Sequence, residues 1–97
     1  MAEQSPQPNL DKTTEEQVRH IPLYRVLLHN DDVNSMGYVV TVLQQVFHFD
    51  QHHAEVVMLE AHHTGVALCV TEPLEQAEFH AEQLTSARLT ATIEPEG

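Results

Sequence analysis

The order of apolar and polar residues along the chain predicts three β-strands. Residues 24–29 are rich in strand-favouring side chains and end at the turn-forming cluster Asn30-Asp31-Asp32. Residues 66–71 form a continuous apolar run of strand length. Near the end of the chain, apolar and polar residues alternate, which is typical of a strand with one exposed face; its apolar members are Leu89, Ala91 and Ile93.

Three further segments carry apolar residues at helical intervals, which predicts three helices between the strands. Either Asn34 or Ser35 caps the first helix and Asp50 caps the second, because a short side chain with an oxygen can accept from the free backbone N–H groups of a first turn. Gly65 suits the left-handed end of the second helix, and Pro73 suits the first position of the third. The predicted buried faces are Met36, Val39, Val40, Leu43 and Phe47, then Ala54, Val57, Met58 and Ala61, then Leu74, Ala77, Ala81 and Leu84.

The resulting order is β-α-α-β-α-β. It predicts a single compact α+β domain, with a three-stranded antiparallel sheet and helices packed on one face. We assign this domain to residues 22–97. Residues 1–21 hold two prolines, scattered charges and little apolar pattern, so we expect a disordered N-terminal extension there.

The net charge of the chain argues against some classes of binding partner. The 97 residues include 4 Lys and Arg against 15 Asp and Glu, a formal net charge of -11. Such a surface repels phosphate groups, so we expect neither nucleic acid nor an anionic membrane as a partner. The apolar runs are too short for a bilayer span, and the polar N-terminus does not resemble a signal peptide. A single cysteine fits a reducing compartment, and we expect a cytoplasmic protein.

The loop Asn30-Asp31-Asp32 is the most unusual local feature, and it allows two interpretations. It is either an Asx turn that precedes a helix cap, or a set of oxygen acceptors for a cation, which is a metal ion or an ammonium group. Calcium loops place acceptors at alternate positions and end in a glutamate, and this loop lacks that spacing.

The histidines and the cysteine give little support for a metal or catalytic centre. The two residues within each of the pairs His52-His53 and His62-His63 point in different directions on a helix, and the pairs lie ten positions apart. No pair of histidines at an interval of four forms within that helix, so we expect no metal site and no cofactor. A histidine-rich metal binder that uses His48 and His52 is the alternative. His62 lies at the edge of an apolar face and is either structural or ligand-binding. Cys69 lies in an apolar strand, so we do not expect an enzyme.

An ordered set of residues resembles the ClpS family of small adaptors, which hand N-degron substrates to a Clp AAA+ protease. The resemblance covers residues 22–94, and it agrees with the predicted order of strands and helices. It rests on Asn30-Asp31-Asp32, Met36, Val39, Leu43, Ala54, Met58, His62, Gly65, Glu75, Ala77 and Glu78.

The resemblance implies a protein that binds free N-termini bearing a first Leu, Phe, Tyr or Trp. Asn30, Asp31 and His62 would hold the α-ammonium group, Asp32 would fix the loop, and Asn34 would contact the substrate backbone. The first side chain would enter an apolar pocket, with Met36 as its gate; the other pocket residues are Val39, Met58, Ala61 and Leu89.

The resemblance also implies a partner, a ClpA- or ClpC-like unfoldase that Glu75 and His80 would face. His80 stands where the family commonly has lysine, which predicts weaker or pH-dependent docking. The N-terminal extension would engage the unfoldase during delivery. The alternative function is an acidic protein–protein interaction module of the same fold that ignores N-termini.

Overall fold

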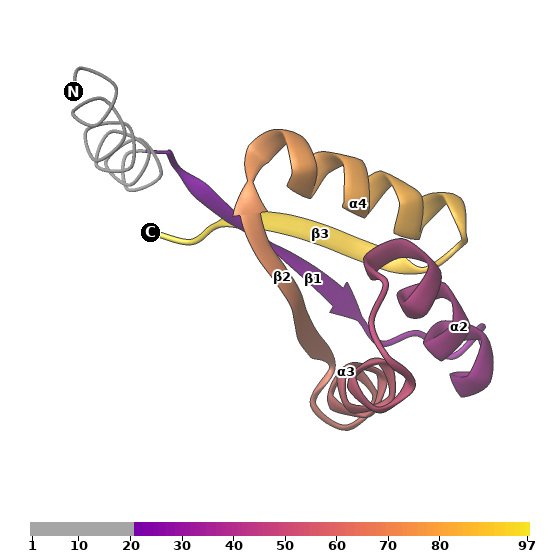
Figure 1. Cartoon of the computed structure of the whole chain (residues 1–97). Helices are drawn as coiled ribbons and strands as arrows, with labels where there is room; N and C mark the ends of the chain where they lie inside the picture. Colours follow the sequence, from indigo (N-terminus) through magenta and orange to yellow (C-terminus); the bar gives the residue numbers. More distant parts are fainter. Residues whose placement is uncertain (1–20) are drawn as a thin grey trace, which may run out of the picture.

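The structure, a computed structural model, describes residues 21–97, so the predicted extension lies outside the described residues except for Ile21. The elements are β1 (Leu23–His29), α2 (Met36–Phe47), α3 (Gln51–Thr64), β2 (Val66–Pro73), α4 (Leu74–Ser86) and β3 (Thr90–Pro95). In Figure 1, α4 runs along the sheet, and α2 and α3 lie at the end of the sheet where β1 ends. The predicted α+β fold and its element order are confirmed.

The sheet has the order β2-β1-β3, and β1 pairs antiparallel with both neighbours. Val26 and Leu28 of β1 are buried under the helices, as are Ala67 and Cys69 of β2. The register shifts beside Val26, so Cys69 is the additional residue of a bulge in β2. Because β1 is the central strand, the loop that follows it leaves the middle of the sheet and faces α2 and α3.

Side-chain caps define where α2 and α3 begin. Ser35 Oγ accepts from the Tyr38 N–H at 3.1 Å, so Ser35 rather than Asn34 caps α2. The predicted cap of α3 is confirmed, since Asp50 Oδ1 accepts from the His53 N–H at 2.7 Å. Gly65 ends α3 at a φ of 95°, a left-handed conformation that glycine adopts without steric cost.

Three details of the predicted pattern are wrong. Pro73 is the last residue of β2, and α4 begins one residue later at Leu74. Leu74 is 39% exposed rather than buried, because it lies at the margin of the face that α4 covers. Met36, predicted on the buried face of α2, is 47% exposed at the start of that helix. Within β2, Val66 and Leu68 are exposed, since the helices cover only one face of the sheet.

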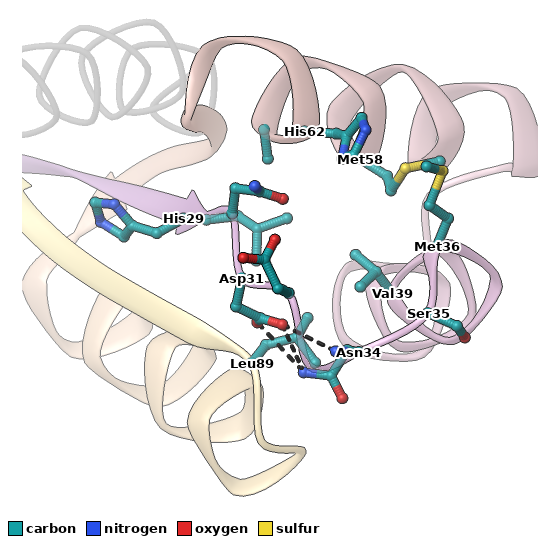
Figure 2. A pocket seen from close by; sticks show the side chains of 13 residues that line it. His29, Asp31, Asn34, Ser35, Met36, Val39, Met58, His62 and Leu89 are labelled. Atoms are coloured by element: carbon teal, nitrogen blue, oxygen red, sulfur yellow. Dashed lines mark hydrogen bonds between the residues drawn. The ribbon is translucent and has the colours of Figure 1, made fainter.

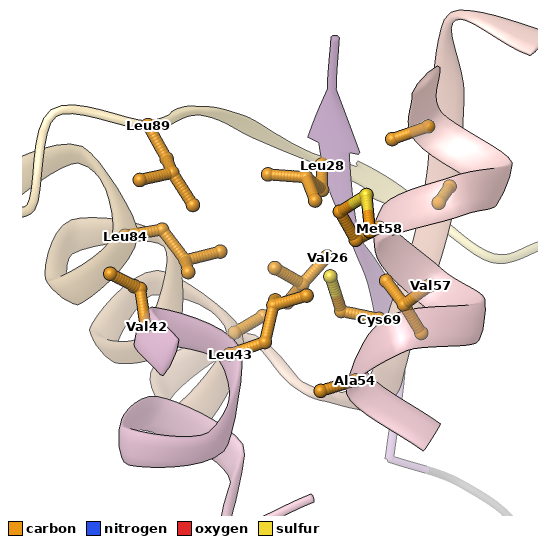
Figure 3. Close-up of a cluster of buried hydrophobic side chains, with 13 residues drawn as sticks. Val26, Leu28, Val42, Leu43, Ala54, Val57, Met58, Cys69, Leu84 and Leu89 are labelled. Carbon is orange, nitrogen blue, oxygen red and sulfur yellow. The ribbon is translucent and has the colours of Figure 1, made fainter. Parts of the chain in front are cut away.

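Helix-to-sheet packing forms one apolar core. Figure 3 shows Leu43 and Leu84, from α2 and α4, meeting Val26 and Leu28 of β1. Leu43 and Leu84 are fully buried. Leu89, which we expected to begin the last strand, lies just before β3 and is also in this core.

Truncation of Leu43 to alanine should lower the free energy of unfolding by about 2–5 kcal/mol, because it leaves a cavity in the core. The matched control is Leu59→Ala on α3, where the side chain is 44% exposed and the expected change is about 0.5 kcal/mol. Urea denaturation followed by circular dichroism measures both. Equal destabilisation by the two variants would contradict the packing described here.

No helix within residues 21–97 combines the length and the apolar character that a bilayer crossing requires. The longest, α3, has 14 residues, whereas a transmembrane helix needs about 20.

Candidate functional site

A cavity of about 310 Å³ lies between the loop after β1 and the sides of α2 and α3 that face it (Figure 2). Its walls include all ten residues predicted for the ammonium site and the apolar pocket: Asn30, Asp31, Asp32, Asn34, Met36, Val39, Met58, Ala61, His62 and Leu89. Leu28, His29 and Ser35 also line it and were not among the predicted site residues. The alternation of β1 could have indicated Leu28, whose side chain points to the helical side.

One side of the cavity is apolar. Ala61 and Met58 of α3 are almost completely buried, as is Leu89 from the α4–β3 connection. Val39 is half-buried, and Met36, the first residue of α2, is 47% exposed at the cavity's edge. An apolar hollow with a few polar groups at its rim is the usual form of a site for a small ligand.

Asp31 provides a fixed carboxylate at the rim. Its Oδ1 accepts from the backbone N–H groups of Val33 and Asn34, each at 3.0 Å, and its Oδ2 accepts from Asn34 Nδ2 at 3.3 Å. The backbone hydrogen bond from Asn34 lowers the pKa of Asp31 most strongly; partial burial opposes it, and the bonds from Val33 and the Asn34 side chain add to it. The carboxylate is therefore both oriented and charged.

Asn34 joins this rim to a distant part of the chain. Its Nδ2 donates to the backbone carbonyl of Arg88 at 2.8 Å, and Tyr38 Oη donates to the carbonyl of Ala87 at 2.8 Å. Arg88 has a φ of 73°, an uncommon value for a residue with a side chain. The Asn34 amide hydrogens are therefore engaged by Asp31 and Arg88, which fixes this side chain between the loop and the α4–β3 connection.

The C-terminal end of α3 forms the opposite rim. The Asn30 backbone N–H donates to the Gly65 carbonyl at 3.0 Å, which ties the loop to the end of this helix. His62 lies in the last turn of α3. Its ring packs edge-on against the ring of His63, with 5.3 Å between the ring centroids. Because a helix dipole is negative at its C-terminus, this position favours a bound cation.

Glu75 and His80 lie on α4 and do not line the cavity. Glu75 is exposed in the first turn of the helix. His80 Nδ1 lies 2.5 Å from Glu72 Oε2, and its ring is 4.9 Å from the ring of Phe47. The structure therefore separates the predicted docking residues from the predicted pocket.

The structure also places the histidines, acidic residues and cysteine of residues 21–97 relative to one another. Within residues 21–97, no three His, Cys, Asp or Glu side chains gather to hold a metal ion. Burial raises the pKa of the Cys69 thiol to about 12, and the charge of Glu60 adds to this effect. The reactive thiolate form of Cys69 is thereby disfavoured.

The fold and the cavity define a class: a small α+β protein with a polar-rimmed apolar pocket at the end of its sheet. The family model described as "ATP-dependent Clp protease adaptor protein ClpS" matches residues 19–92. The chain therefore belongs to the ClpS family, the adaptors of the ATP-dependent Clp protease, as its sequence resemblance indicated.

Several relatives are similar over most of the chain. The ClpS adapter of Synechococcus sp. (strain CC9902) is 52% identical over 88 residues, which are 90% of this chain and 85% of that protein. The chloroplastic adapter CLPS1 of Chlamydomonas reinhardtii is 49% identical over 77 residues, 78% of this chain and 48% of that protein.

A solved structure has the same fold. It is Agrobacterium tumefaciens ClpS2 bound to L-phenylalaninamide, with a TM-score of 0.75 and 34% identity. The similarity covers 79% of this chain and 100% of that chain.

Proposed function

We propose that the cavity binds the free N-terminus of a protein whose first residue is large and apolar, and that the chain delivers this protein to a Clp AAA+ unfoldase. The observation that carries the proposal is the combination, in one cavity, of cation-accepting groups at the rim and an apolar wall behind them. Phenylalaninamide, the ligand of the similar ClpS2 structure, has the same two features, a free amine and an apolar side chain.

In this proposal the α-ammonium group donates to Asn30, Asp31 and His62, while Asp32 supports the loop. An ammonium group has three N–H donors, so the three acceptors, two from the loop after β1 and one from α3, can satisfy all of them. Asp31 supplies the opposite charge, and the C-terminal end of α3 adds to the favourable potential. Asn34 Oδ1 faces the backbone N–H of the second residue.

The first side chain occupies the apolar part of the cavity, and Leu, Phe, Tyr and Trp are the proposed first residues. Burying such a side chain contributes roughly 1.5–3 kcal/mol, and each hydrogen bond to a charged group contributes roughly 1.5–3 kcal/mol. After several kcal/mol of association cost, these contributions correspond to a dissociation constant on the order of micromolar.

The direct test compares two peptides that differ only at the amine. A fluorescent peptide beginning with Phe should bind, and its N-acetylated form should bind at least about 100-fold more weakly, because acetylation leaves desolvated acceptors unpaired. Fluorescence anisotropy measures both affinities. Equal affinities would contradict the proposal and favour an acidic interaction module that ignores N-termini.

Delivery is assigned to α4, whose exposed Glu75 lies away from the cavity. Glu75→Lys should leave the affinity for the Phe peptide unchanged, yet slow degradation of a Phe-initiated protein by the unfoldase and its peptidase about tenfold, the change expected from one lost charged contact. Glu60→Lys, at an exposed position on α3, is the control and should degrade normally. Normal degradation with the Glu75 variant would remove this face from the proposal.

A further inference from the structure

A second cavity, of about 560 Å³, lies between α2 and α3 beside the candidate pocket. Two residues line both cavities, Met36 from α2 and Met58 from α3. Figure 2 shows their side chains reaching toward each other across the gap between the two helices. The wall between the cavities therefore includes two thioether side chains from different helices.

This wall is built from adaptable groups. A methionine side chain is unbranched, has three rotatable bonds and repacks at low cost, which makes it suited to a movable surface. Met36 is 47% exposed, and exposed side chains change rotamer within nanoseconds. Met36 is therefore a part of this wall that can change rotamer without movement of a helix.

The space behind the wall is suited to an apolar group. Val40 and Leu59 provide apolar surface there, and Gln51 and Glu55, which are hydrogen-bonded to each other at 3.2 Å, form part of its polar margin. Gly37 lies beside Met36, and a Cβ placed on it would meet no atom within 4 Å. The first turn of α2 therefore leaves this space unfilled.

We propose that Met36 and Met58 form a movable partition, and that the distal part of a long aromatic first side chain passes it and rests in the α2–α3 cavity. The inference rests on the proposed function, because binding of the α-ammonium group at the polar rim directs the first side chain toward the partition. The α2–α3 cavity then extends the range of first residues to side chains longer than a single ring. The observation that assigns this occupant is that the α2–α3 cavity lies directly behind the candidate pocket and shares the Met36–Met58 wall with it.

The probes are two peptides of identical sequence, one beginning with Phe and one beginning with 4-phenylphenylalanine. The full chain should bind them with affinities within about threefold of each other. Gly37→Leu fills the second cavity and improves the helix propensity of this position, so the fold is retained. It should weaken the 4-phenylphenylalanine peptide about tenfold and the Phe peptide less than about twofold. Gln45→Leu, an exposed position of α2 that does not line either cavity, is the matched control and should change neither affinity.

NMR provides a direct readout of the occupant. Protons of the distal ring should show nuclear Overhauser contacts to the Leu59 methyl groups, and the Phe peptide should show none. Rejection of the longer side chain by the unmodified chain, or equal weakening of both peptides by Gly37→Leu, would overturn the partition. Failure of the proposed function is distinguishable, because the Phe peptide itself would then not bind or would bind equally when N-acetylated.

Discussion

Replacement of Asp31 by alanine should weaken binding of a Phe-initiated peptide by about 100-fold, the largest effect expected of a single substitution in this chain. The variant removes the negative charge proposed to face the ammonium group. It also removes the acceptor for the backbone N–H groups of Val33 and Asn34, so the loop loses its fixed shape. Isothermal titration calorimetry measures the loss of affinity.

Asp31→Asn separates these two contributions. An asparagine Oδ1 still accepts from both backbone N–H groups, so the turn is preserved while the charge is lost. We expect a loss of about tenfold or more from the charge alone, with a melting temperature close to that of the unmodified chain.

Asp50→Ala is the matched control, since Asp50 is also an aspartate that accepts from a backbone N–H. It caps α3 at the end remote from His62, so its loss should cost about 1 kcal/mol of stability and leave peptide affinity unchanged. If Asp50→Ala weakens binding as much as Asp31→Ala, the proposed role of the Asp31 charge is wrong.

Acidification should weaken binding about tenfold between pH 7.5 and pH 5, and His62 is the group held responsible. A neutral imidazole accepts from the ammonium group, whereas its protonated form places a like charge beside it. Histidine in general changes charge in this range. Asp31 does not contribute to this loss: its pKa is lowered in the folded chain, so its charge persists as the pH falls to 5 and is lost only as the pH falls through that lowered pKa.

The His62→Gln variant tests this assignment, because its amide oxygen accepts a hydrogen bond and does not titrate. Its affinity should be nearly constant from pH 7.5 to pH 5. His29→Gln is the control: His29 also lines the cavity, but its Nε2 is hydrogen-bonded to Thr92 Oγ1 at 2.7 Å on β3. If His29→Gln rather than His62→Gln makes the affinity independent of pH, His29 is the residue that causes the pH dependence.

The sequence predicted the elements well because local chemistry determines them. Apolar intervals placed the buried face of α3, and Asp50 and Gly65 marked the two ends of that helix correctly. On α2 they placed Leu43 but missed the buried Val42. The errors at Met36 and Leu74 have one cause. Each residue follows the apolar interval of its helix but lies at the margin of the face that other elements cover, and that margin is a property of the assembled layers rather than of any local segment.

The candidate site was likewise predictable from the sequence only in part. The resemblance indicated which residues belong to the site, and the fold brings these residues around one cavity. The contacts that orient them could not be predicted, because Asn34 and Arg88 are 54 positions apart and their approach requires the complete topology. The pairing of His80 with Glu72 likewise depends on how α4 folds back beside β2.

The two hydrogen bonds that run from Asn34 and Tyr38 to the carbonyls of Arg88 and Ala87 have a consequence for protein engineering. Only three residues connect α4 to β3, so inserting one there would withdraw both carbonyls from their donors. A designer who transplants residues 30–34 into another scaffold must therefore move this short connection with them. Without the connection, the grafted segment keeps its sequence, but Asn34 loses the hydrogen bond to Arg88 that orients its side chain.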